Sequence, residues 1–174
     1  MADETRVVQA GEWRAALAVA RDEGYAFFDW LSAVDRTHDE AAPGYDLTAH
    51  LLDVSTPGAL HGILVVARVA DGEPVESVTT VYAGAAWHER ETHEMFGVDF
   101  TGFTDGTELG LRPLLLPDGF EGTPLRKAFV LAARASKPWP GAKEPGESEA
   151  GTSPSRRKML PPGVPDPQWG PRDD

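Results

Sequence analysis

The chain has 174 residues, of which 41% are hydrophobic, and it contains no cysteine. This length suits one domain with a modest core, and the lack of cysteine excludes disulfides, all-thiolate iron–sulfur clusters and thioether-linked haem in this chain. Its 16 basic and 28 acidic residues give a net charge of −12, which argues against nucleic-acid binding because a duplex would repel such a surface.

The first predicted element is a helix at residues 12–23. Trp13, Leu17 and Ala20 recur at helical spacing on one face, which we expect to pack on a sheet, and Gly24 ends the helix. The aromatic residues 25–31 that follow are typical of either a strand or a short helix.

Two strands are predicted at residues 45–54 and 60–69, because apolar residues alternate there and a Ser-Thr-Pro-Gly turn separates the two segments. A third strand is predicted at residues 75–82, which are rich in valine and threonine. Helices and strands in this order predict an α+β fold, a two-layer sandwich of helices on a mixed or antiparallel sheet.

Residues 85–96 predict a charged helix of about three turns. Arg90 and Glu94 are four residues apart, so both lie on one face. Gly97 predicts a left-handed cap at the end of this helix, and residues 98–100 predict a short strand.

The next segment, residues 97–129, is extended, rich in glycine and proline, and contains six leucines. Fully burying each leucine is worth roughly 1.5–3 kcal/mol, so we expect the leucines to be covered. Two covers remain open, the chain's own core and the surface of a partner. The leucines are Leu109, Leu111, Leu114, Leu115, Leu116 and Leu125.

The composition changes after residue 136, which divides the chain into a domain at 1–136 and a proline- and glycine-rich tail at 137–174. The tail has too few apolar residues for a core of its own. It contains Trp139, which favours an arm pinned along a partner, and a disordered tail is the alternative.

No catalytic, cofactor-binding or metal-binding residue is predicted. His88 and His93 are five residues apart, whereas the zinc motif on a helix needs histidines four apart on one face. The dense carboxylates of residues 89–94 are typical of a solvated helix face, with no apolar pocket nearby to raise a carboxyl pKa. Phosphate-loop, dinucleotide-binding and nucleophile-elbow motifs are missing from the sequence.

Two blocks carry a family resemblance, Glu-Arg-Glu-Thr-His-Glu-Met-Phe-Gly at residues 89–97 and Leu-Pro-Asp-Gly-Phe-Glu-Gly-Thr-Pro-Leu-Arg-Lys at 116–127. They resemble the signature of the C subunit of bacterial proton-translocating NADH:quinone oxidoreductase, complex I, with the signature region at 87–129. The chain resembles a divergent member, because Thr123 stands where the family commonly has histidine and the loop at 102–110 is longer.

The resemblance implies a non-catalytic, cofactor-free subunit of the peripheral arm. The assembled enzyme would pass electrons from NADH through FMN and iron–sulfur clusters to quinone and translocate protons. FMN and the clusters would reside in partner subunits. This chain would pack against the quinone-site (D-type) and terminal-cluster (B-type) subunits. It would lie on the cytoplasmic side of a bacterial cell membrane, touching the membrane only through the complex.

Two alternatives to this function remain. One is the equivalent subunit of a related membrane-bound hydrogenase or formate-oxidising complex. The other is a free-standing adaptor that binds other proteins through the leucine-rich segment and the tail.

A subunit interface is predicted on the charged helix and the extended segment. The alternative for the helix is an exposed, salt-bridged surface, in which each pair contributes only about 0.3–0.5 kcal/mol. The predicted interface residues are Glu89, Arg90, Glu91, Glu94, Phe96, Gly97, Arg112, Leu125, Arg126, Lys127 and Trp139.

Overall fold

The computed structural model describes residues 4–130, and the predicted tail with Trp139 lies outside the described residues. In chain order the elements are β1 (Glu4–Gln9), the 3-10 helix η1 (Ala10–Glu12), α1 (Trp13–Asp22), β2 (Phe27–Asp35), β3 (Tyr45–Asp53), β4 (His61–Val69), β5 (Val75–Glu76), α2 (Ala85–Phe96) and β6 (Phe100–Thr101).

The main sheet has four strands in the order β1-β4-β3-β2. Strands β2, β3 and β4 are antiparallel, with Leu47 opposite Ala33 on one side and Ala67 on the other. Strand β1 runs parallel to β4, so the sheet is mixed. The predicted hairpin is β3 and β4, and the predicted α+β class is confirmed.

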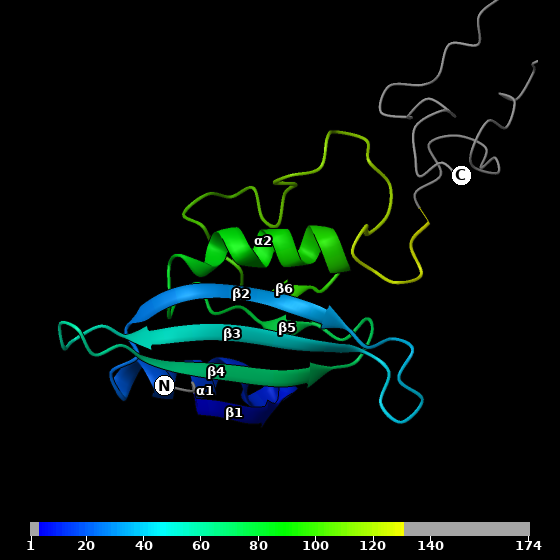
Figure 1. Ribbon diagram of the computed structural model, residues 1–174. Helices are drawn as coiled ribbons and strands as arrows, with labels where there is room; N and C mark the ends of the chain where they lie inside the picture. The colour runs from blue at the N-terminus through cyan, green and yellow to red at the C-terminus, as the bar shows by residue number, and fades with distance from the viewer. Residues whose placement is uncertain (1–3, 131–174) are drawn as a thin grey trace, which may run out of the picture. The chain divides into compact units, whose positions relative to one another are not determined.

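One face of the sheet is buried under both helices. Alternate residues of β3 and β4 are fully buried, as period-two alternation requires. Trp13, Leu17 and Ala20 of α1 have no exposed surface and belong to the same core cluster, which confirms the predicted helix face. Figure 1 shows α2 running beside β2, while α1 lies by β1 and β4. The fold is therefore the predicted two-layer sandwich.

The ambiguous segment after α1 is a strand, β2, with an irregularity between Phe28 and Trp30. Phe28 pairs with Leu51 and Leu31 pairs with Ala49, so one extra residue interrupts the alternation in β2. This bulge explains why residues 25–31 lack a clear strand pattern.

The strand predicted at residues 75–82 is wrong beyond its first two residues. Only Val75 and Glu76 form β5, which pairs with β6 in a separate two-stranded sheet. The chain then turns, because the Val78 N–H donates to the carboxylate of Glu89 at 2.7 Å instead of to a neighbouring strand. The hydroxyl of Tyr82 donates to the carbonyl of Tyr25 at 2.8 Å, which holds this turn against the end of α1.

Within residues 4–130, neither helix is long enough and apolar enough to span a bilayer. The described part of the chain therefore contains no candidate transmembrane helix.

The predicted cap of α2 is confirmed. Gly97 has φ +77°, and its N–H donates to the carbonyl of His93 at 2.8 Å. A Cβ at Gly97 would lie 3.0 Å from Nη2 of Arg126 and 3.3 Å from Cγ2 of Thr123. Glycine is therefore required by the backbone conformation and by the close approach of the later chain.

Replacing this glycine tests both requirements. We expect Gly97→Ala to lower the free energy of unfolding by more than Gly58→Ala, measured by urea titration. Gly58 is the matched control, since it has φ +80° and open space around its Cβ position. The free energy of unfolding of the control should fall by about 1–2 kcal/mol, because alanine is strained in the left-handed conformation. Equal losses would contradict the role of the contact with Arg126 and Thr123.

Candidate functional site

The site is the surface of α2 and the chain that crosses it. We call residues 102–127 the strap. After β6 the strap loops over the side of α2 that faces away from the sheet (Figure 1). It returns to the C-terminal end of α2, where the Leu125 N–H donates to the carbonyl of Met95 at 3.1 Å. Charged side chains of α2 make most of the other hydrogen bonds to the strap.

Glu94 binds three consecutive backbone N–H groups of the strap. Its carboxylate accepts from Leu114 at 3.2 Å, from Leu115 at 2.9 Å and from Leu116 at 2.6 Å. Successive N–H groups that converge in this way form an anion-binding concavity, and hydrogen bonds to an ionised acceptor are the stronger kind. The charge of Glu94 is therefore used within the chain.

Arg90 holds the preceding residues of the strap by their carbonyl groups. Its Nε donates to the carbonyl of Arg112 at 3.1 Å and its Nη2 to that of Pro113 at 2.7 Å. We call Arg90 and Glu94 the clamp. Their four-residue spacing on one helix face lets them contact the backbone of residues 112–116 without a gap.

Arg126 anchors the end of the strap. Its Nε donates to the carbonyl of Phe96 at 2.7 Å, and its Nη2 pairs with Asp71 at 2.9 Å. The guanidinium also lies over the ring of Tyr45, 5.3 Å from its centroid, in a cation–π arrangement. The strap is thus fixed at the C-terminal end of α2 as well as at the clamp.

The next residue ties the strap to the main sheet. The backbone N–H of Lys127 donates to Asp35, the last residue of β2, at 2.6 Å. Burial opposes ionisation of Asp35, but hydrogen bonds from Thr37 and from the Lys127 N–H outweigh it and lower its pKa to about 2. Asp35 is therefore a charged anchor near neutral pH.

Glu89 faces the interior. Its side chain has no exposed surface and accepts hydrogen bonds from the Ser77 hydroxyl and the Val78 N–H, both at 2.7 Å. Burial raises the pKa of Glu89 to about 7, against the effect of these two hydrogen bonds. The expectation of solvated carboxylates without an apolar environment is therefore wrong at this position.

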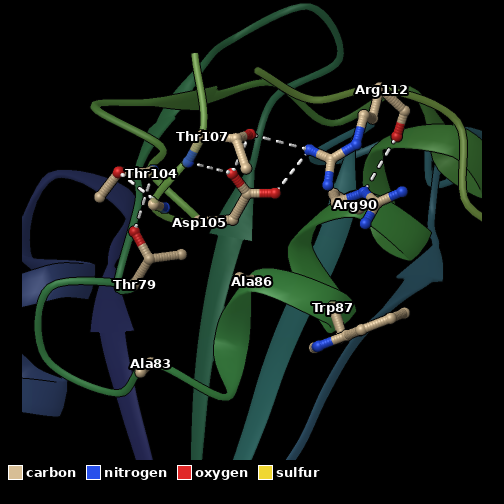
Figure 2. Close-up of a pocket in the computed structure, with 10 residues that line it drawn as sticks. Thr79, Ala83, Ala86, Trp87, Arg90, Thr104, Asp105, Thr107 and Arg112 are labelled. Atoms are coloured by element: carbon tan, nitrogen blue, oxygen red, sulfur yellow. Dashed lines mark hydrogen bonds and ion pairs between the residues drawn. The ribbon is translucent and has the colours of Figure 1, made fainter. Parts of the chain in front are cut away.

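A hollow of about 600 Å³ lies between the start of α2 and the first part of the strap. Figure 2 shows Trp87, Arg90, Asp105 and Arg112 around it. Arg112 forms an ion pair with Asp105. Hydrogen bonds from Thr107 and then from Arg112 lower the pKa of Asp105 to about 2, so this carboxylate is ionised near neutral pH.

The structure brings nearly all the predicted interface residues within residues 4–130 to α2 and the strap. Glu89, Arg90 and Glu94 are buried and bind their own chain, so the alternative of an exposed, salt-bridged helix is wrong for them. The interface assignment itself stays a prediction, because its test needs a partner. Glu91 and Gly97 are half-buried, Phe96 is buried, Arg112 and Arg126 are paired within the chain, and Leu125 and Lys127 are exposed.

The leucines of the strap differ in how far the chain itself covers them. Leu111 packs against the core, and Leu114 and Leu116 are half-buried. Leu109, Leu115 and Leu125 remain 67%, 59% and 54% exposed. The chain's own core therefore covers only part of the apolar surface of the strap.

Sequence reasoning missed Ser77, Asp105 and Trp87. Ser77 and Asp105 acquire their contacts only through folding, and nothing in the local sequence marks them. Trp87 had a signal, because a tryptophan three residues before an arginine on a helix shares its face. The structure has Trp87 63% exposed, with the Arg90 guanidinium 5.6 Å from the ring centroid.

The described region has no cluster of side chains that would support metal binding. Residues 4–130 contain no group of three or more histidine, cysteine, aspartate or glutamate side chains placed to hold a metal ion. The charged side chains that α2 directs at the strap bind its backbone.

The fold and the site define a small α+β domain that presents a fixed extended segment on one helix. The chain belongs to the family described as respiratory-chain NADH dehydrogenase, 30 Kd subunit, whose model matches residues 6–135.

Two curated relatives illustrate this membership, and both are C subunits of an NADH-quinone oxidoreductase. The protein from Sinorhizobium medicae is 38% identical over 130 residues, which cover 73% of this chain and 60% of that protein. The protein from Bartonella tribocorum is 49% identical over 114 residues, covering 65% of this chain and 52% of that one. This chain thus spans somewhat more than half the length of these relatives.

Solved structures support the fold. A trypsin-resistant fragment of Nqo5 matches with a TM-score of 0.52 at 20% identity, over 58% of this chain and 80% of that one. A chain of the membrane-bound sulfane sulfur reductase, an archaeal respiratory membrane complex, matches with a TM-score of 0.56 at 24% identity, over 68% of this chain and 66% of that one.

The ionisation of Glu89 can be tested with Glu89→Gln. The folded-state pKa of about 7 lies above the ordinary value of 4.5. The contribution of protonated Glu89 to the free energy of unfolding is therefore fully present below its unfolded-state pKa, and it is lost as the pH rises through 7. From this group alone, we expect the wild-type free energy of unfolding to fall by ~2 kcal/mol between pH 5 and pH 8.

The glutamine variant should lack this part of the pH dependence, because its amide can accept from Val78 and donate to Ser77 without titrating. Urea unfolding of both proteins at pH 5 and pH 8 gives the comparison. Parallel pH profiles for the two proteins would contradict an ionising, buried Glu89.

Glu94→Ala tests the clamp. Removing the carboxylate leaves three strap N–H groups without their acceptor, and a hydrogen bond to a charged group is worth about 1.5–3 kcal/mol. We expect amide hydrogen exchange at residues 114–116 to rise by roughly tenfold or more, while α2 keeps its protection. Glu91→Ala is the matched control, because Glu91 makes no hydrogen bond with residues 4–130 through its side chain. Unchanged exchange in Glu94→Ala would contradict the clamp.

Proposed function

We propose that this chain is a non-catalytic, cofactor-free subunit of the peripheral arm of an NADH:quinone oxidoreductase. Family membership supports this role, as do relatives whose names give them as the C subunit of that enzyme. In the assembled enzyme electrons pass from NADH through FMN and iron–sulfur clusters to quinone, coupled to proton translocation. FMN and the clusters belong to partner subunits, and this chain contributes a structural surface.

The observation that carries the proposal is the strap, whose backbone is held from inside while three of its leucines face outward. Arg90 and Glu94 bind main-chain atoms of residues 112–116. Leu109 and Leu115, on either side of the held carbonyls, are more than half exposed. Binding costs less when the contacting segment is already ordered, so a fixed strap with outward leucines suits a subunit interface.

The partners follow from the same role. The strap and α2 pack against the quinone-site (D-type) subunit and the terminal-cluster (B-type) subunit. The chain reaches the cytoplasmic side of the bacterial membrane through these subunits. In this assignment the strap is an interface and the buried charges of α2 position it.

Substitution of the exposed leucines tests the proposal. We expect the double variant Leu109→Asn and Leu115→Asn to keep the free energy of unfolding of the isolated chain within about 1 kcal/mol, because both side chains are exposed and each such substitution usually changes it by no more than about 0.5 kcal/mol. Recovery of other arm subunits by affinity purification from native membranes should fall roughly tenfold. The control is Leu60→Asn, at a leucine 61% exposed next to β4, outside the strap.

Failure of the wild-type chain to recover other arm subunits under gentle conditions would contradict the proposed function. Equal recovery by the control and the double variant would contradict the role of the strap. Flavin or cluster absorbance in the purified wild-type chain would contradict the cofactor-free assignment.

A further inference from the structure

The hollow between α2 and the strap has an excess of positive charge. Two guanidinium groups, those of Arg90 and Arg112, line it together with the single carboxylate of Asp105. Asp105 pairs with Arg112, while Arg90 donates its hydrogen bonds to neutral carbonyl groups of the strap. The lining therefore has one more positive charge than negative charge, and a second carboxylate that entered the hollow would be attracted to both guanidinium groups.

Both arginines have N–H groups to spare. Within residues 4–130, the hydrogen bonds of Arg112 all leave from Nη1, and those of Arg90 leave from Nε and Nη2. A guanidinium carries five N–H donors in a planar fork. Nε and Nη2 of Arg112 and Nη1 of Arg90 therefore remain as donors for an incoming carboxylate.

Trp87 forms the apolar rim of the hollow. It is 63% exposed, and the guanidinium of Arg90 lies 5.6 Å from the centroid of its ring. In Figure 2 the indole of Trp87 lies beside the hollow, on the side away from Asp105. Tryptophan and arginine are the residue types most enriched where a few side chains carry the binding energy of an interface.

The two arginines are held before any partner arrives. The strap carbonyls fix Arg90, and Asp105 together with the hydroxyl of Thr107 fixes Arg112. Little side-chain entropy is then lost when the hollow is filled. The same hydrogen bonds keep the two guanidinium groups on one wall.

We propose that this hollow is a docking pocket for an aspartate or glutamate side chain of a partner subunit, with the carboxylate between Arg90 and Arg112 and a neighbouring apolar residue on Trp87. The charge excess of the hollow selects an acidic occupant. The inference rests on the proposed function, since the occupant belongs to another subunit of the assembly. It adds the chemistry of one contact, which the exposed leucines alone do not specify.

Site-specific cross-linking in the assembled complex tests the pocket. The photoreactive residue p-benzoylphenylalanine is placed at position 87 of the full chain in its host, and membranes are irradiated before mass spectrometry. We expect a cross-link to a partner peptide that has an aspartate or glutamate within a few residues of the attachment point. The same residue at position 115 of the strap serves as the matched control.

The two positions separate the two hypotheses. Suppose that the probe at position 115 cross-links to another subunit, while the probe at position 87 cross-links only to this chain or to a partner peptide without an acidic residue. The docking pocket is then overturned and the proposed function stands. If neither position reaches another subunit, the proposed function is overturned with it.

A second variant tests the pocket without a bulky probe. We expect Trp87→Ala to reduce the retention of the chain in the native complex roughly tenfold, with little change in the melting temperature of the isolated chain, because the indole is exposed. Trp30→Ala, the same substitution on β2 outside the pocket, should leave retention unchanged. Equal retention for the two variants would overturn the pocket.

Discussion

The arrangement of α2 and the strap depends on the contact between the clamp and the backbone of the strap. Arg90 and Glu94 present opposite charges on one face of α2, and the strap presents two carbonyls followed by three N–H groups. A segment rich in glycine and proline cannot satisfy its backbone by forming a helix or joining a sheet. The clamp supplies the missing partners and so determines where the strap lies.

The same principle accounts for the other buried charges. Asp35 receives the N–H of Lys127 at the end of the strap, and Glu89 receives the N–H of Val78 before α2. Besides a hydroxyl group, each of these acidic side chains binds irregular backbone rather than an oppositely charged side chain. Burying a polar group without a partner is costly, so these residues and the loops they hold depend on each other. Irregular segments on both sides of α2 are thereby fixed to one helix and one strand.

How much could be predicted from the sequence follows from where the signal lies. The α1 helix, the β3–β4 hairpin and the cap at Gly97 follow from local periodicity and turn chemistry, and the sequence predicts them. Strand β1 was missed because it is half polar and pairs in parallel with distant β4. The spacing of Arg90 and Glu94 was visible, but their partners were not, because backbone groups are the same for every residue type. The sequence therefore indicates a charged helix face, but it does not indicate what that face contacts.

A clamp that binds backbone leaves the side chains of the strap available for another purpose. If α2 held the strap by apolar packing, Leu109, Leu115 and Leu125 would be buried in the domain's own core. Instead these three leucines are more than half exposed. The clamp contacts only the backbone of residues 112–116, so its hold depends little on which side chains these residues carry, and those side chains can be suited to a partner. The buried charges and the exposed leucines are thus two parts of one arrangement, in which α2 fixes the segment and the segment presents the surface.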